Sequence, residues 1–141
     1  MTADEFLNRP RLMEKRIRRM TEELEELSTR AENCTPSYGG DTVQHSRNVD
    51  GMFVLVMRIR DAEARLNWEI DRLVDTKREI LSMIRRIGNR EIEAVLEAVN
   101  LDGLSMGKAA ERLSISKHAV WNRYHRGEEI IEAMIKEEKY A

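Results

Sequence analysis

The chain has 141 residues, which is room for one ordinary domain or for a small domain with an extended appendage, and this excludes large multidomain enzymes. Charged residues make up 35% of the sequence and aromatic residues only 5%, and this composition is typical of long helices, so we expect an all-α fold. The net charge of −2 argues against a basic protein that coats nucleic acid, but it is compatible with a basic face on one part of the molecule.

The sequence contains one cysteine, Cys34, which excludes an internal disulfide and a zinc site with several cysteine ligands. His45 stands without the partners that a metal site needs, and we expect neither a metal nor a cofactor. No apolar run approaches the roughly 20 residues of a membrane span, and the amino terminus lacks the apolar core of a signal peptide. We therefore expect a cytoplasmic protein that does not enter the membrane.

The first predicted helix begins at a capping box formed by Thr2 and Glu5, in which each side chain satisfies a backbone N–H of the other residue. Pro10 leaves two alternatives: the helix kinks there, or the main helix begins at Pro10 after a separate turn. Beyond Pro10, apolar residues recur at alternating spacings of four and three, which is the signature of a coiled-coil seam. These residues are Met13, Ile17, Met20, Leu24 and Leu27.

The stretch from Asn33 to Asn48 is predicted to be a loop, because Pro36, Gly39 and Gly40 lie among short polar residues. The loop proper covers about residues 34–48 and is longer than a helical hairpin requires. Loops of this length are functional or disordered, and we expect this one to be disordered.

The stretch from Val49 to Ile87 is predicted to be one long helix with a strict seven-residue repeat. The repeat consists of Met52, Ile59, Leu66, Leu73, Ile80 and Ile87. Such a line of Leu and Ile must be buried against a partner helix, and the nearest partner is the first helix. Residues 1–87 are therefore predicted to form a long antiparallel helical hairpin.

A hairpin of two helices has little core, and further apolar residues, among them Val56, Trp68, Ile70 and Ile84, lie on other faces of the second helix. Extra apolar surface of this kind predicts packing between chains, so we expect a homo-oligomer, at least a dimer. The residues predicted to mediate this contact are Met52, Ile59, Leu66, Leu73 and Ile80. The alternative is a monomeric hairpin capped by the C-terminal helices.

Residues 88–141 are predicted to form a compact three-helical domain. Gly88 and Asn89 end the long helix, since glycine allows the left-handed turn beyond the last helical residue. A helix is expected over Arg90–Asn100, and Asp102 and Gly103 form the turn that follows it.

The next stretch, LSMGKAAERLSISKHAVWNRYHRG, has the pattern of a helix-turn-helix. A short amphipathic helix over Ser105–Leu113 is followed by a break at Ser114 and Ile115, and Ser116 is placed to cap the second helix. Small or apolar residues stand where the two helices must touch: Ala109, Ala110, Leu113, Ile115 and Val120. The second helix of such a unit enters the major groove of DNA.

The residues left facing outward are predicted to contact double-stranded DNA. Five Lys and Arg residues against the single anion Glu111 give Leu104–Arg126 a local charge of +4, and these cations would neutralise phosphates. Asn122 can pair with adenine, and Lys117 can donate to guanine. The complete predicted set is Lys108, Arg112, Ser116, Lys117, His118, Trp121, Asn122, Arg123, His125 and Arg126.

Two aromatic residues of the second helix are assigned differently. Tyr124 is predicted to lie in the core, because it follows Val120 by one turn on the inward face. For Trp121 the pattern allows two places, one in the core and one facing the groove, where its ring would cover a thymine methyl group.

The segment ISKHAVWNRYHRGEEII, preceded by KAAERL, resembles the helix-turn-helix of sigma-factor region 4 and, more closely, that of phage and prophage regulators of the ArpU and RinA type. Those regulators are similar in having an N-terminal helical hairpin and a middle segment like EIDRLVDTKREI, here Glu69–Ile80. The resemblance implies control of late phage genes through promoter or operator DNA. Two positions depart from it: Gly107 and Lys108 replace an acidic pair, and Ser114 stands where glycine is usual in the turn.

These observations predict a DNA-binding transcriptional regulator that oligomerises through its hairpin, with contact to RNA polymerase left open. The alternatives are a phage DNA-packaging subunit similar to a small terminase subunit, and a structural coiled-coil adaptor that does not bind DNA. An enzyme is not expected, because the sequence has no nucleotide-binding glycine loop and no arrangement of His with Cys or of Ser with His and Asp.

Overall fold

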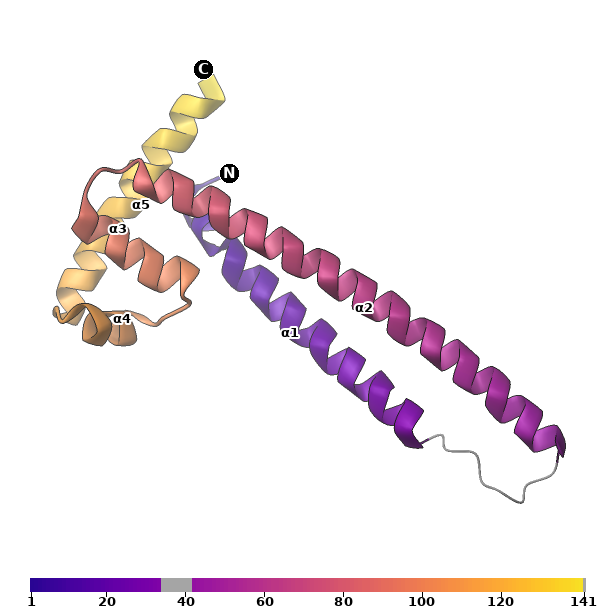
Figure 1. Ribbon diagram of the computed structural model, residues 1–141. Coiled ribbons are helices and arrows are strands. Elements are labelled where there is room, and N and C mark those ends of the chain that lie inside the picture. The colour runs from indigo at the N-terminus through magenta and orange to yellow at the C-terminus, as the bar shows by residue number, and fades with distance from the viewer. Residues whose placement is uncertain (34–41, 141) are drawn as a thin grey trace. The chain divides into compact units, whose positions relative to one another are not determined.

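A computed structural model of the chain describes residues 1–33 and 42–140, and those residues form helices and turns without a strand (Figure 1). The predicted all-α class is therefore confirmed. The elements in chain order are α1 (Ala3–Asn33), α2 (Thr42–Arg85), α3 (Arg90–Leu96), the π-helical turn η1 (Glu97–Leu101), α4 (Met106–Leu113) and α5 (Lys117–Tyr140). None of the helices among these residues combines the length and the apolar character needed to cross a bilayer.

The beginning of α1 has the predicted capping box. The Thr2 N–H donates to Glu5 Oε2 (3.3 Å), and the Glu5 N–H donates to Thr2 Oγ1 (3.2 Å). Pro10 lies inside α1 and its ring is fully buried. The helix thus runs on through the proline, and the alternative of a main helix that begins at Pro10 is wrong. Burial of the ring offsets the hydrogen bond that a proline inside a helix removes.

The second helix begins at Thr42, seven residues before the predicted start at Val49. The prediction that residues up to Asn48 form a loop is therefore wrong for 42–48, because no proline or glycine interrupts this stretch and a helix extends at the gain of one hydrogen bond per residue. The rest of the predicted loop, with Cys34, lies outside the described residues, as does the His45 side chain.

The long helix ends at Arg85, and the turn after it uses glycine as predicted. Gly88 has a φ of 76°, in the left-handed region that favours glycine. Asn89 then caps α3, since its Oδ1 accepts hydrogen bonds from the N–H groups of Glu91 (3.0 Å) and Ile92 (3.3 Å).

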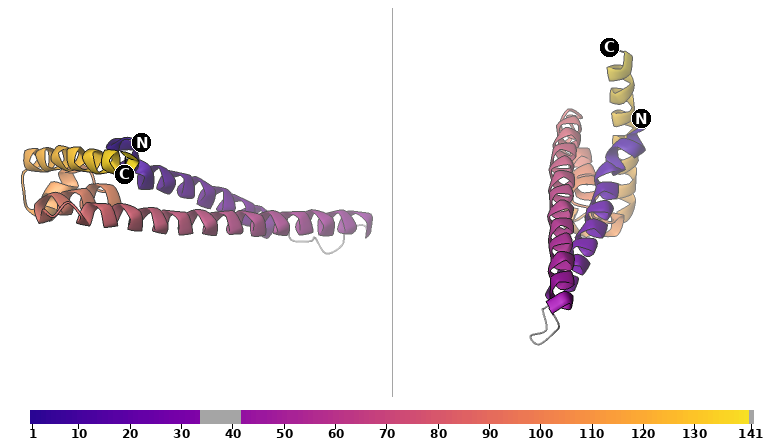
Figure 2. Two further views of the ribbon diagram at one scale, coloured as in Figure 1. Left: turned by 90° about the horizontal axis from the view of Figure 1, so that it is seen from above. Right: turned by 90° about the vertical axis from the view of Figure 1, so that its right-hand side faces the viewer.

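The chain forms two compact units, and the boundary between them differs from the one predicted at residues 87 and 88. One unit, here called the head, consists of Met1–Met13 and Leu73–Ala141, and the other, the arm, consists of Glu14–Arg72. The first turns of α1 lie beside α5 within the head (Figure 2), where the Ala3 N–H donates to Glu132 Oε2 (2.6 Å). The ends of the predicted hairpin thus belong to the same unit as the helix-turn-helix.

The head contains the hydrophobic core. Its largest fully buried apolar side chains come from α1, α2, α3 and α5, and they are Leu7, Pro10, Ile80, Ile84, Val95, Leu96, Val120 and Ile131. Ile80 was predicted to mediate contact between chains, but it has no exposed surface in the single chain. The Ile80 side chain packs in the hydrophobic core of its own chain. A heptad pattern shows that a helix face is buried, but it does not distinguish burial within one chain from burial against a second copy.

The arm has no buried hydrophobic side chain among residues 14–33 and 51–72, whose burial the structure describes. The seam of α1 and the line of Met52, Ile59 and Leu66 on α2 are half-buried, and Leu73 is half-buried at the start of the head segment. Glu69 is buried, with one carboxylate oxygen 3.8 Å from the Arg16 guanidinium. Two surface hollows lie between the two helices of the arm. The arm therefore has no closed hydrophobic core, because it consists of only two helices.

Candidate nucleic-acid interface

The predicted helix-turn-helix is present, and a serine caps each of its helices, the predicted Ser116 at α5 and also Ser105 at α4. Ser105 Oγ accepts from the Lys108 N–H (3.2 Å) at the start of α4, and Ser116 Oγ accepts from the Ala119 N–H (3.1 Å) at the start of α5. These bonds satisfy N–H groups that have no partner within their own helix. The caps therefore place the beginning of α5 where the sequence predicted it.

The turn between α4 and α5 has the geometry that glycine would favour, although a serine occupies it. Ser114 has φ 56° and ψ 42°, in the left-handed helical region. Its N–H donates to the Glu111 carbonyl (3.3 Å), and the N–H of Ile115 donates to the Ala110 carbonyl (3.1 Å). The turn thus keeps its form with serine, at the steric cost that a Cβ carries in this region.

The predicted contact residues of the two helices do lie inward. Ala109, Ala110 and Val120 are buried, while Leu113 and Ile115 are half-buried against the same core. Small side chains at these positions let α4 and α5 approach closely, which holds the angle between them.

Gly127 is a structural residue that the sequence analysis missed. It is buried, and a Cβ at this position would lie 2.8 Å from Leu96 Cδ1 and 3.0 Å from Ile92 Cγ2. The absence of a side chain therefore lets α5 cross α3 at close range, which fixes α5 on the rest of the head. A lone glycine inside a helical pattern was the available signal.

The residues predicted to face outward are exposed, with one exception. The exception is Arg123, which is half-buried. The exposed residues are Lys108, Arg112, Ser116, Lys117, His118, Trp121, Asn122, His125 and Arg126. The structure excludes the core position for Trp121, because 52% of this residue is exposed. Tyr124 is buried, as predicted.

Three rings follow one another along the exposed side of α5. The His118 ring is stacked on Trp121 with centroids 6.4 Å apart, and the His125 ring lies on the other side at 4.2 Å, tilted by 59°. A Trp ring that stays exposed to water gives up the free energy that its burial would provide. The Trp121 ring lies in an open row between basic residues, where it is accessible to a partner.

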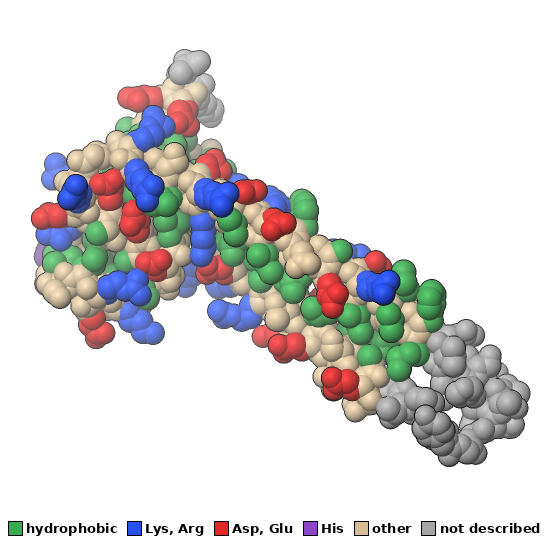
Figure 3. All heavy atoms as spheres, viewed as in Figure 1, with side chains coloured by type: hydrophobic (Ala, Val, Ile, Leu, Met, Phe, Trp, Pro, Cys, Tyr) green, Lys and Arg blue, Asp and Glu red, His purple; other side chains and the backbone are tan. Residues whose placement is uncertain are grey.

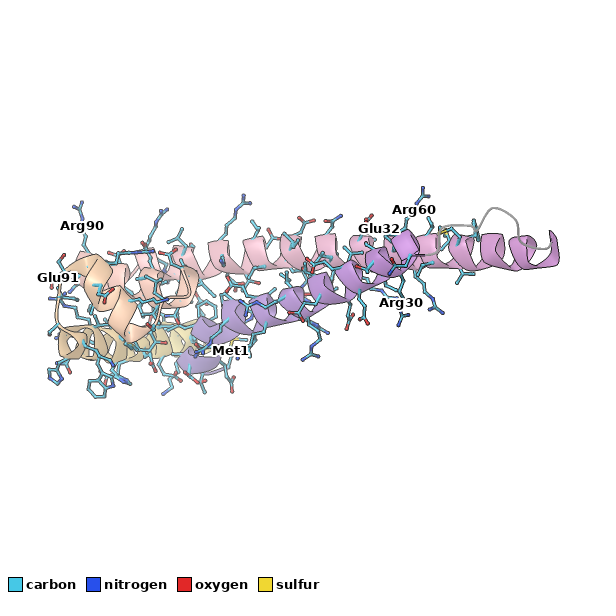
Figure 4. The ribbon with its side chains drawn as sticks, turned by 90° about the horizontal axis from the view of Figure 1, so that it is seen from below. Met1, Arg30, Glu32, Arg60, Arg90 and Glu91 are labelled. Atoms are coloured by element: carbon cyan, nitrogen blue, oxygen red, sulfur yellow. The ribbon has the colours of Figure 1, made fainter. Side chains whose placement is uncertain are left out.

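Two of the five cations counted from the sequence are already paired with anions of preceding elements. Arg112 Nη1 lies 2.9 Å from Asp102 Oδ2, and Arg123 Nη2 lies 3.4 Å from Glu91 Oε2, at the start of α3 (Figure 4). Exposed pairs of this kind are weak and can exchange their partner for a phosphate. The other three cations, Lys108, Lys117 and Arg126, have no ion pair within the described residues. Because Arg112 and Arg123 are neutralised, the local positive charge is smaller than the +4 counted over Leu104–Arg126. Figure 3 shows this mixture of Lys, Arg, Asp and Glu on the surface of the head.

Behind the exposed row, Tyr124 is held by a buried polar residue that the sequence analysis did not single out. The Tyr124 hydroxyl donates to Asn100 Oδ1 (3.1 Å), and both residues are buried. Asn100 lies in η1, where the Asp102 N–H bonds back to the Glu97 carbonyl (2.9 Å) in the wider π-helical pattern. Burial raises the pKa of Tyr124, and the nearby Glu128 carboxylate raises it further.

One carboxyl at the edge of the row is also perturbed. Partial burial raises the pKa of Glu128, and the carboxylates of Asp4 and Glu132 act in the same direction, whereas His125 opposes them. One Glu128 carboxylate oxygen lies 3.8 Å from His125 Nδ1, which places this group directly behind the exposed rings.

In the part of the chain that the structure describes, no three His, Cys, Asp or Glu side chains are grouped so that they could hold a metal ion. The candidate site is an exposed face of α5 that carries basic and aromatic side chains and is held by the three-helical domain behind it. No known family, characterised protein or solved structure matches this chain, so its activity is inferred from its own residues.

Proposed function

We propose that this chain is a sequence-specific regulator of transcription that binds double-stranded DNA with α5 and acts in the cytoplasm as a homo-oligomer. The observation that carries the proposal is the exposed row of His118, Trp121 and His125 beside Lys117 and Asn122, on the second helix of a helix-turn-helix. That helix is the one that lies in the major groove in proteins built this way.

In the proposed complex, Lys108, Lys117 and Arg126 neutralise phosphates, and Arg112 and Arg123 join them if their ion pairs with Asp102 and Glu91 open. Each neutralised phosphate releases a condensed counterion, so the affinity falls as salt rises. Three contacts predict a slope of about −2.7 for log K against log salt in each bound head, and five predict about −4.5.

Base reading falls to the exposed polar and aromatic side chains of the first two turns of α5. Asn122 is suited to a bidentate pair with adenine, and Trp121 to contact with a thymine methyl group. The tight support behind these residues, through Gly127 and Tyr124, favours such readout because base contacts need a rigidly held helix.

A single head offers a small footprint, which favours an assembly that carries several heads. The half-buried apolar lines of the arm are the surface available for this assembly. The resemblance of α5 and of Glu69–Ile80 to regulators of the ArpU and RinA type supports a role in the control of late phage genes, with RNA polymerase as a further partner.

The proposal is tested by selecting bound sequences from a pool of random duplexes with the full-length protein and then measuring affinity against salt. Lys117→Ala should weaken binding and make the salt slope less steep by about one. Lys136→Ala is the matched control, since Lys136 is an exposed cation on the same helix outside the face. A wild-type protein that enriches no sequence and shows no salt-dependent binding would contradict the proposal.

A further inference from the structure

The exposed rings of His118, Trp121 and His125 follow one another along one side of α5, and we call them the ring row. Their spacings of three and four residues place them on one side of the helix. Both histidines are exposed, and 52% of Trp121 is exposed. A ligand that covers the Trp121 ring gains the free energy that its exposure to water forgoes.

The two histidine rings are arranged differently around Trp121. The His125 ring is close to it, with centroids 4.2 Å apart, and is tilted by 59°. The His118 ring is parallel to Trp121 within 10°, and the centroids are 6.4 Å apart, at the wide end of the range for an aromatic pair. Because these two rings are parallel, their faces point in the same direction, and one planar ligand can stack on them.

The ring row is supported from the core of the head. The Tyr124 ring meets His125 edge-on, with centroids 6.0 Å apart, and the Tyr124 hydroxyl donates to Asn100 Oδ1. Tyr124 and Asn100 are both buried. One Glu128 carboxylate oxygen lies 3.8 Å from His125 Nδ1. These contacts restrict the rings before a ligand arrives, so less conformational entropy is lost when one binds.

Unpaired cations stand at both ends of the ring row. Lys117 precedes His118 and Arg126 follows His125, and both cations are exposed and have no ion pair within the part of the chain that the structure describes. Lys117 lies four residues before Trp121 and therefore on the same side of the helix. Proteins bind single-stranded nucleic acid by combining cations along the backbone with aromatic rings on which the bases stack.

The face of a base is accessible where the base is unpaired. In a duplex the neighbouring bases cover each face, and a protein in the groove meets the edges of the base pairs. In a single strand the bases can turn outward and stack on aromatic side chains. The ring row presents ring faces, and the ligand that matches them is an unpaired base.

We propose that the ring row is a stacking platform for the unpaired bases of single-stranded DNA, with Trp121 at its centre and with Lys117 and Arg126 on the phosphates. This activity goes beyond the proposed reading of duplex DNA and does not depend on it, because every base has a face that can stack. It gives α5 a second ligand wherever the two strands of a bound duplex separate.

The fluorescence of Trp121 tests the stacking directly. The sequence has two tryptophans, so Trp68→Phe leaves Trp121 as the single reporter. Titration of this protein with oligothymidylate, which forms no duplex with itself, should quench the fluorescence. A strand of equal length made of abasic nucleotides has the same phosphates but should bind about 5- to 150-fold more weakly and without quenching, because a stacked base contributes a factor of this size. Trp121→Phe, which leaves Trp68 as the reporter, is the matched control and should show no quenching.

Substitutions separate the stacking from the charge. Trp121→Ala should weaken the binding of oligothymidylate about 5- to 150-fold and keep the slope of log K against log salt at about −1.4, the value for two neutralised phosphates on a single strand. Lys117→Ala should instead make the slope less steep by about 0.7. Lys136→Ala, an exposed cation of α5 outside this face, should change neither quantity.

Equal affinities for oligothymidylate and the abasic strand, or Trp121 fluorescence that does not change in the bound state, would overturn the stacking platform. Tighter binding of oligouridylate than of oligothymidylate would assign the ring row to RNA and overturn the proposal for DNA. A protein that selects a duplex sequence but does not bind oligothymidylate would keep the proposed function and lose the platform. A protein whose Trp121 is quenched by oligothymidylate but which enriches no duplex sequence would do the reverse.

Discussion

Gly127 lies against the fully buried Leu96, with no space for a side chain between α5 and α3. Gly127→Ala should therefore lower the free energy of unfolding by about 1–3 kcal/mol, because Leu96 cannot move aside within a close-packed core. Gly107→Ala in the first turn of α4 is the control: no atom lies within 4 Å of its Cβ position, so an alanine there should not destabilise the protein. Chemical denaturation followed by circular dichroism measures both, and equal effects of the two substitutions would contradict this packing.

The left-handed conformation of Ser114 predicts that glycine is better tolerated there than serine. Ser114→Gly should raise the free energy of unfolding by up to about 1 kcal/mol, because the steric cost of the Cβ exceeds the added entropy of the unfolded glycine. Ser114→Val should lower it by more than that, since a branched side chain fits this region poorly. Thermal unfolding of both proteins checks the order, and a stabilising valine would mean that the turn has another geometry.

The buried bond between Tyr124 and Asn100 predicts a clear effect of removing one oxygen. Tyr124→Phe should cost about 1 kcal/mol of stability, since the Asn100 oxygen is left without its donor in the core. The control is Trp121→Phe, which changes an exposed ring of the same helix and should alter stability little. Thermal unfolding compares the two variants with the wild type, and an unaffected melting temperature in the Tyr124 variant would show that the bond contributes nothing.

The raised pKa of Glu128 predicts a stability that depends on pH. Because the folded state binds the proton more tightly than the unfolded state, the stabilisation is complete below the ordinary pKa of 4.5 and is lost as pH rises through the folded value. Glu128→Gln should therefore raise the melting temperature at pH 7, and the gain should disappear near pH 4. Glu129→Gln, on the exposed side of α5, is the control. A Glu128 variant that is less stable than the wild type at pH 7 would show that the pair with His125 outweighs burial.

Much of the local structure could be predicted from the sequence because its signals lie within a few residues. The Thr2 and Ser116 caps and the left-handed Gly88 depend on neighbours along the chain, and the structure has all three. Ile80 was assigned to the wrong environment because a heptad shows only that a face is buried, and not which helix covers it.

The candidate interface was predicted in outline but not in its charges or its support. The exposed residues of α5 follow from helical periodicity, whereas the pairing of Arg112 with Asp102 and of Arg123 with Glu91 depends on how separate elements meet. The bond from Tyr124 to Asn100 is of the same kind. Periodicity alone also left Trp121 between the inward and the outward side, and only the packing of α3 against α5 resolves its position.

The most direct test of DNA reading by α5 compares the wild type with Asn122→Ala on a selected site and on random duplex of equal length and salt. The loss of a bidentate pair should weaken binding to the selected site about 10- to 100-fold and relax the preference at one base pair, while binding to random duplex stays nearly constant. Equal affinities of the two proteins for the selected site, or equal losses on both duplexes, would contradict the claim that this face of α5 reads the sequence of DNA.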